Sequence, residues 1–215
     1  MAKQHQKKRP PYLGNLILAF ILATLLFVGI FILGYTISYQ KYQGVLLAQE
    51  QFRYNLLSFE VERELLEGSC DDFNPYLFSA EMDNMGSVIG ILEDRLGKQD
   101  PQVLDQKRTY SLLEARHFLY IIEHNDVCNN TIPTILFFYS NEEEYKDEAE
   151  RVGFMLSSLK KDEEVMIYSF DYDLDSSLIT LLKDKYNVIR PNLLVINERR
   201  LLNVFEDVDE IKDEL

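Results

Sequence analysis

The chain is poor in the residues that build redox, zinc and disulfide-rich sites. It has three histidines and only two cysteines, Cys70 and Cys128, which lie far apart in the sequence. They do not form the Cys-x-x-Cys spacing that lowers a thiol pKa and supplies a reactive thiolate. His117 and His124 share one helical face, but two histidines alone do not make a zinc site. The sequence therefore offers no thiol-exchange motif, and we expect no metal and no cofactor.

Charge is absent from residues 13–40. Within them, Leu16 to Ile37 is nearly all apolar and would span about 33 Å as a helix, which matches a hydrocarbon core of about 30 Å. A cleavable signal peptide has a shorter apolar run and a small-x-small cleavage site. Gly34 to Ser38 is a poor cleavage site. We therefore interpret residues 13–40 as an uncleaved transmembrane signal anchor in the lipid bilayer.

Acidic residues are missing before this span and abundant after it. All 36 acidic residues and all but four of the 22 basic residues follow residue 40. By the positive-inside rule, the tail of residues 1–12 stays in the cytoplasm and the chain from Lys41 onward lies outside it, at the cell membrane. So acidic a domain is not expected to bind nucleic acid by releasing counterions. The four basic residues of the tail are Lys3, Lys7, Lys8 and Arg9.

Residues 41–128 are predicted to be helical. Turn signals at Gly68-Ser69 and Gly97–Pro101 divide them into three helices. Because the connections are short, neighbouring helices should be antiparallel, and the first and third helices then end at the same end of the bundle. The predicted helices are Gly44–Glu67, a second after the N-cap Ser79 that carries Met82, Met85, Ile89, Leu92 and Leu96, and Gln102–His124 with an apolar stripe of Leu112, Ala115, Leu119 and Ile122.

This topology brings the two cysteines together. Cys70 follows the first helix and Cys128 follows the third. Two cysteines in an extracytoplasmic domain usually pair. We therefore predict a structural disulfide between Cys70 and Cys128, the alternative being two unpaired thiols.

Two acidic patterns resemble metal sites but lack essential parts. Glu114 and His117 stand at the Glu-x-x-His spacing of di-iron bundles, which need a second copy and further glutamates from four helices. Because the chain offers one copy and three helices, we assign both residues to a solvated helix face. The acidic residues at 171, 173 and 175 alternate as in a calcium loop, but the glycine and closing glutamate of an EF-hand are absent.

Residues 133–215 alternate predicted strands and helices. The first strand is apolar without alternation, which is typical of a sheet covered on both faces. The order is βαβαββα, and a helical crossover between the first two strands should make them parallel. The fold class is thus a transmembrane helix, a three-helix region and an α/β or α+β domain. Its predicted elements are Thr134–Tyr139, helix Glu142–Leu159, Val165–Phe170, helix Ser176–Lys185, Asn192–Ile196, Arg200–Phe205 and helix Val208–Leu215.

This order, with Pro191 just before the third strand, resembles the thioredoxin-like superfamily over residues 133–215. The stretch Tyr186–Ile196 is similar to that family's passage from the second helix through a cis-proline into the third strand. The resemblance implies that Pro191 is cis and that the backbone of Arg190 takes the position that contacts substrate in active members. A trans proline at the start of a strand remains the alternative, because trans is the commoner state of X–Pro bonds.

Active members of that superfamily carry Cys-x-x-Cys at the N-terminus of the domain's first helix. Those positions fall here on Glu143 and Lys146 or, with a longer loop, on Lys146 and Ala149. Thiol exchange by the family mechanism is therefore excluded unless another chain supplies the sulfur. What the resemblance leaves is a groove beside Arg190 and Pro191, bordered by Glu143 and Lys146, that would bind an extended segment of a partner protein.

These features favour a membrane-anchored module for protein binding or complex assembly without enzymatic activity. One alternative is a redox protein in which Cys70 and Cys128 form a reversible pair. Another is a scaffold in which the helices, with Gly29 and Gly34 in the span, form a homo-oligomer.

Two short motifs bear on location and modification. Asn129-Asn130-Thr131 is an N-glycosylation sequon. Lys212-Asp213-Glu214-Leu215 spells an endoplasmic-reticulum retention signal, which makes that membrane the alternative location.

Overall fold

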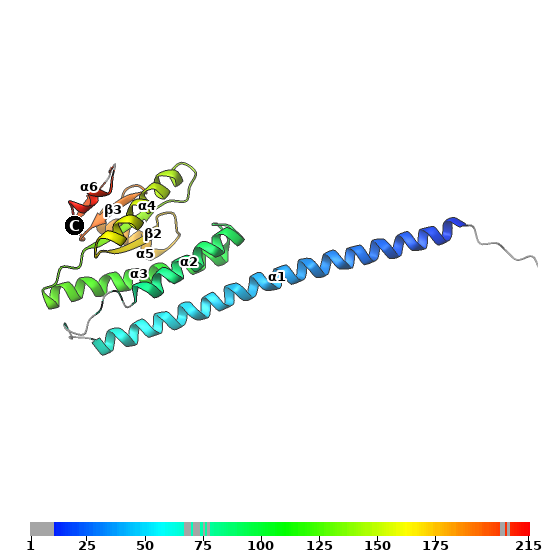
Figure 1. Ribbon diagram of the computed structural model, residues 1–215, viewed down its shortest axis with the longest axis horizontal. Coiled ribbons are helices and arrows are strands. Elements are labelled where there is room, and N and C mark those ends of the chain that lie inside the picture. Colours follow the sequence, from blue (N-terminus) through cyan, green and yellow to red (C-terminus); the bar gives the residue numbers. More distant parts are fainter. Residues whose placement is uncertain are drawn as a thin grey trace, which may run out of the picture. The chain divides into compact units, whose positions relative to one another are not determined.

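Figure 1 shows the computed structural model of the chain, which describes residues 11–66, 70, 74, 76, 78–202, 205 and 207–215. The chain divides into two compact units, Met1–Leu47 and Ala48–Leu215. The predicted basic tail up to residue 10 and the predicted helix end at Gly68-Ser69 lie outside the described residues.

The first unit contains the apolar part of helix α1 (Pro11–Leu66). Tyr12–Tyr39 is long and apolar enough to cross a membrane, and none of its most apolar stretch is buried. The hydroxyls of Thr24 and Thr36 donate to carbonyls one turn earlier, so neither is left unpaired in an apolar surrounding. The predicted apolar helix is confirmed, whereas its orientation across a membrane stays a prediction.

Three helices form the first layer of the second unit. They are the part of α1 after residue 47, α2 (Ser79–Leu96) and α3 (Pro101–Cys128). Phe52 and Phe59 of α1 are buried in the core, and the ring of Phe59 lies 4.7 Å from that of Phe78. The predicted N-cap Ser79 is wrong by one residue: Phe78 takes the cap position, and the Ser79 hydroxyl donates to the Tyr76 carbonyl.

The Cys70–Cys128 disulfide is confirmed, with the two Cα atoms 5.6 Å apart. Helix α3 is longer than predicted at both ends, so Cys128 lies in its last turn instead of after it. Asp100 caps the start by accepting from the Gln102 amide, and Asn129 ends the helix in the left-handed region. A cross-link of this kind typically stabilises a domain by about 2 to 4 kcal/mol.

The predicted burial of α3 is partly wrong. Leu112 and Leu119, expected on the apolar stripe, are each 55% exposed. Glu114 and His117, assigned to a solvated face, are only 3% and 2% exposed. The reason is that α3 packs between two layers, because the His117 ring lies 5.6 Å from Phe59 on one side and its Nδ1 lies 2.8 Å from the Tyr168 hydroxyl on the other.

A mixed four-stranded sheet forms the next layer, in the order β2-β1-β3-β4. The predicted element order is confirmed, and β1 is parallel to β2 and antiparallel to β3. The last pair, β3 and β4, is also antiparallel. The elements are β1 (Thr134–Tyr139), α4 (Lys146–Asp162), β2 (Met166–Asp171), α5 (Ser177–Tyr186), β3 (Leu193–Ile196), β4 (Arg200–Leu202) and α6 (Val208–Lys212).

Both faces of the sheet are covered, which explains the unbroken apolar sequence of β1. Successive strand residues point to opposite faces. Leu136 and Phe138 join a core with α3 and α5, whereas Ile135 and Phe137 join a second core with α4 and α6. Strand β2 forms one edge of the sheet.

The predicted cis-proline is wrong, because the Arg190–Pro191 bond is trans like every other described peptide bond. Trans is the commoner state of X–Pro bonds. The chain enters β3 through Asn192, which has a φ of 61°. Its amide N–H donates to the Phe138 carbonyl at 2.6 Å, and this contact sets the start of the strand.

The start of α4 is also later than predicted. Glu142 to Tyr145 form a turn before the helix, which begins at Lys146. The hydroxyl of Ser140 accepts the Glu142 amide N–H at 3.0 Å and holds this turn in place. The acidic residues of the first helical turn are therefore Asp147 and Glu148.

Candidate functional site

The structure places the four residues of the predicted groove in two adjoining segments. Pro191 is buried and Arg190 is partly exposed, at the entry to β3. Glu143 is exposed in the turn before α4, and its carboxylate pairs with Lys146 at 2.6 Å. That these residues form a binding groove stays a prediction.

Asn192 ties these segments together. Its side-chain Nδ2 donates to the Tyr145 carbonyl and to Glu148 Oε2, both at 2.9 Å. Its Oδ1 accepts the Ser140 amide N–H at 3.4 Å. The entry to β3 is thus fixed against the N-terminus of α4 by one buried amide, at the place where the resemblance implied a cis-proline.

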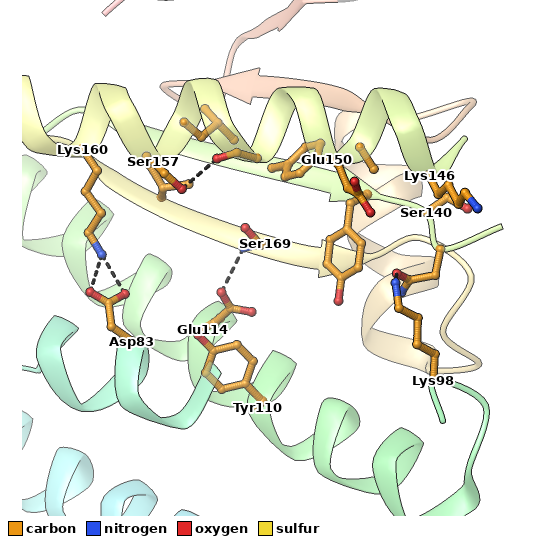
Figure 2. Close-up of a pocket in the computed structure, with 17 residues that line it drawn as sticks. Asp83, Lys98, Tyr110, Glu114, Ser140, Lys146, Glu150, Ser157, Lys160 and Ser169 are labelled. Atoms are coloured by element: carbon orange, nitrogen blue, oxygen red, sulfur yellow. Dashed lines mark hydrogen bonds and ion pairs between the residues drawn. The ribbon is translucent and has the colours of Figure 1, made fainter. Parts of the chain in front are cut away.

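A cavity of about 370 Å³ lies over the β2 edge of the sheet, on the face that α4 covers (Figure 2). This volume is within the range of small-ligand pockets. The β1 and β2 strands supply the floor, α4 supplies one wall, and α2 and α3 supply the other. Its apolar lining consists mainly of Phe137, Ala149, Leu156 and Ile167.

Glu114 of α3 is the most unusual group in this cavity. It is 3% exposed, and its Oε1 accepts the amide N–H of Ser169 at 2.9 Å. Its Oε2 is buried and has no hydrogen-bond partner in the part of the chain that the structure describes. Leaving such an atom unpaired costs about 1 to 3 kcal/mol or more.

The position of Glu114 follows from the geometry of the edge strand. The amide N–H groups of Met166 and Tyr172 donate to the carbonyls of Pro133 and Tyr139, on the β1 side of β2. Backbone amides alternate in direction along a strand, so the amide N–H of Ser169 points away from β1, toward the open edge of the sheet. Unpaired edge groups are an aggregation hazard, and a charged side chain is one way to cover them. Capping the Ser169 amide uses only one of the two carboxyl oxygens.

Burial raises the pKa of the Glu114 carboxyl to about 8. The hydrogen bond from Ser169 opposes this rise, nearby Asp83 adds to it, and Lys160 opposes it. Below this pH the carboxyl is mostly protonated, and above it the group carries a charge. The cavity therefore holds a titratable group whose charge changes near neutral pH.

Ion pairs and hydrogen bonds close the two ends of the cavity, as Figure 2 shows. At one end, Lys160 of α4 reaches Asp83 of α2 at 2.7 Å. At the other end, Lys98 donates to the Asn141 side chain at 2.8 Å. Lys146, one of the predicted groove residues, also lines this second end.

A buried ionic cluster lies in an adjoining cavity that shares Asp83, Tyr110, Tyr139 and Ser169 with the first. Lys107 of α3 is 4% exposed at its side chain and lies 2.5 Å from Glu93 and 2.8 Å from Asp171. Its Nζ lies 5.7 Å from the centre of the Tyr139 ring. Burial, and after it the charge of Asp171, raises the pKa of Tyr139 well above its usual value, so this tyrosine stays neutral.

The other residues singled out in the sequence lie elsewhere. Asn129 of the sequon is exposed at the end of α3. Lys212 pairs with Glu163 at 3.2 Å, and Glu214 pairs with Arg200 at 2.5 Å, so these two C-terminal side chains contact the domain. No group of histidine, cysteine or acidic residues that could hold a metal occurs among the described residues.

Sequence reasoning missed Glu114 and Lys107 as buried groups. Both lie on α3, seven residues apart, and are therefore on one helical face. Two charges at this spacing on a helix that also buries apolar residues were the only available signal.

Comparison of the chain with protein-family models, curated proteins and solved structures found no match.

Proposed function

We propose that the chain is a single-pass membrane protein that presents a thioredoxin-like domain outside the cytoplasm and binds partner proteins without thiol chemistry. The strand order and strand directions of the sheet support the likeness. The apolar helix Tyr12–Tyr39 supports the anchor. The basic tail before it and the acidic chain after it support the orientation at the cell membrane.

The observation that carries a binding role is the cavity at the β2 edge. It combines an apolar floor with a few convergent polar groups, which is the usual composition of a binding pocket. Glu114 presents an unsatisfied carboxyl oxygen there, and a bound partner would satisfy it. Both cysteines of the chain are joined to each other, so neither supplies a thiol to this cavity or to the N-terminus of α4.

The first prediction concerns redox activity. The full chain in detergent is expected to reduce insulin disulfides in the presence of dithiothreitol no faster than buffer does, because a reactive thiolate is missing. The rate is followed by the turbidity of precipitating insulin. The matched control is the Cys70→Ser/Cys128→Ser variant, which should behave identically. Reduction that is faster than buffer and disappears in this variant would replace the proposal by the reversible-pair alternative.

The second prediction concerns orientation. Two variants are compared, Glu144→Cys in the second unit and Lys7→Cys in the basic tail; the native disulfide does not react with maleimides. A membrane-impermeant maleimide added to intact cells should label Glu144→Cys, whereas Lys7→Cys should react only after lysis. The reverse pattern would refute the orientation. If Glu144→Cys is not labelled on intact cells but is labelled from the lumenal side of endoplasmic-reticulum vesicles, the protein lies in the endoplasmic-reticulum membrane instead.

A further inference from the structure

Two acidic groups reach the cavity from opposite walls without a cationic partner. Glu114 projects from α3 and Glu150 from α4, as Figure 2 shows. Among the described residues, no lysine or arginine nitrogen lies within ion-pair distance of either carboxylate. The third acidic residue of the lining, Asp83, is already paired with Lys160.

The basic residues of the lining are already occupied. Lys160 pairs with Asp83, Lys146 with Glu143, and Lys98 with the Asn141 side chain. A cationic ligand would therefore give the buried Glu114 carboxylate the partner that its Oε2 lacks. The strongly acidic composition of the chain after residue 40 would also attract such a ligand at long range.

The hydrogen bonds of Glu114 select the kind of cation. A guanidinium prefers both oxygens of a carboxylate in a bidentate pair, whereas an ammonium is a compact point charge that one oxygen can bind. Because Oε1 already accepts from the Ser169 amide, only Oε2 has no hydrogen-bond partner among the described residues. This favours an ammonium group.

The apolar lining selects what the ammonium is attached to. Phe137 and Ile167 lie on the strands that form the floor, and Leu156 lies on the α4 wall, of the same cavity that Glu114 lines. A chain of methylene groups would cover this apolar surface while its charged end reaches Glu114, and lysine side chains commonly bind in this way.

We propose that this cavity binds an alkylammonium group, with the charged nitrogen on Glu114 Oε2 and the alkyl stem on Phe137, Leu156 and Ile167. This rests on the proposed function, since a lysine side chain of a partner protein is one source of the group; a free amine is the other. Capping the edge strand accounts for Oε1 alone and leaves Oε2 without a role.

The test measures binding to the full chain in phosphatidylcholine nanodiscs by isothermal titration calorimetry. The probes are n-butylammonium chloride, n-butanol and the peptide acetyl-Gly-Lys-Gly-amide, with empty nanodiscs as the blank. Butylammonium is expected to bind and n-butanol is not. Glu114→Gln should weaken the binding of butylammonium at least tenfold. The matched control Glu81→Gln removes an exposed acidic group outside the cavity and should leave the binding unchanged.

Binding should also depend on pH. The charged groups near Glu114 are Asp83 on α2 and Lys160 on α4. Three tyrosines also face it, Tyr110 on α3, Tyr139 on β1 and Tyr168 on β2, and they stay neutral because burial raises the pKa of each. Because only the ionised carboxylate binds a cation well, the affinity for butylammonium should rise by about tenfold or more from pH 6.5 to 8.5. Phosphate and HEPES buffers are used, since neither contains a primary amine.

The outcomes separate the two sources and the two proposals. Tighter binding of the peptide than of butylammonium identifies a lysine of a partner chain, and binding of butylammonium alone identifies a free amine. Absence of binding by both probes, equal binding by Glu114→Gln, or affinity that falls as the pH rises would overturn the inference. If one of these results occurs and the protein does not reduce insulin, the proposed function still stands. If the protein reduces insulin through its cysteines, the proposed function is refuted, but the inference about the cavity is not.

Discussion

Replacing Lys107 by methionine is expected to lower the free energy of unfolding by about 3 to 5 kcal/mol, the usual cost of removing one partner from a buried ionic cluster. The Lys107 ammonium lies within 2.8 Å of both Glu93 and Asp171, whose side chains are 16% and 8% exposed. Without it, two carboxylates remain close together in a poorly solvated site. Urea denaturation of residues 48–215 at pH 7, followed by far-ultraviolet circular dichroism, would measure the loss.

Lys107 remains charged in the folded protein. Burial alone would lower its pKa, but Asp171 first and then Glu93 outweigh this effect and raise the pKa above its usual value. The raised pKa of Lys107 therefore contributes stability at neutral pH and up to the unfolded pKa of lysine, about 10.4. On the alkaline side this contribution is lost as the pH rises through the higher pKa of the folded state.

Two variants control for effects unrelated to the cluster. Lys185→Met removes a lysine that is 51% exposed and lies 3.6 Å from Glu198, and it should cost less than about 1 kcal/mol. Adding Glu93→Gln and Asp171→Asn to Lys107→Met should restore part of the lost stability, since no uncompensated charge then remains. A loss below about 1 kcal/mol for Lys107→Met, or no recovery in the triple variant, would show that the cluster is not a coupled unit.

Local sequence patterns were sufficient for most of the architecture. Strand β1 matches its predicted bounds at both ends, because a short apolar run between turn residues defines a covered strand well. The disulfide followed from topology, since short connections place the ends of the first and third helices together. The helical crossover correctly predicted that β1 and β2 are parallel, whereas the antiparallel pairing of β1 with β3 was not predicted.

The candidate site was beyond sequence reasoning for a physical reason. Periodicity assumes that a helix has one buried face, whereas α3 is covered from two sides and buries polar residues that find partners in other elements. Glu114 finds the Ser169 amide, 55 positions along the chain, and Lys107 finds Asp171, 64 positions along. Such contacts depend on the packing of α3 against β2, which a local pattern does not contain.

The proline prediction failed for a related reason. The position of Pro191 before β3 matched the expected pattern, but the backbone there is set by Asn192, whose side chain contacts Ser140, Tyr145 and Glu148. These three partners come from the β1–α4 segment, and the turn they hold needs no cis bond.

The free energy of unfolding of the folded domain is expected to fall as the pH rises from about 4.5 to 8. The ionisation of Glu114 alone should lower it by up to about 4 kcal/mol. In the unfolded chain a glutamate ionises near pH 4.3. In the folded protein, burial keeps the Glu114 proton bound up to a pKa of about 8. The folded state therefore binds more protons in this window, and each pH unit within it costs about 1.4 kcal/mol.

Glu114→Gln isolates this effect, because glutamine keeps an oxygen for the Ser169 amide and does not ionise. Urea denaturation of residues 48–215 at pH 5 to 9 measures the free energy of unfolding. The variant should become more stable relative to the wild type as the pH rises, and the difference should level off above pH 8. Glu81→Gln, which removes an exposed carboxylate, should differ from the wild type by a constant amount. If the difference in stability between Glu114→Gln and the wild type is also constant with pH, the prediction is wrong. The Glu114 carboxyl would then ionise at the usual pH of a glutamate, because water or a counter-ion reaches Oε2. The same loss of stability at high pH is what a bound ammonium would offset, so butylammonium should stabilise the wild type above pH 8 and leave Glu114→Gln unchanged.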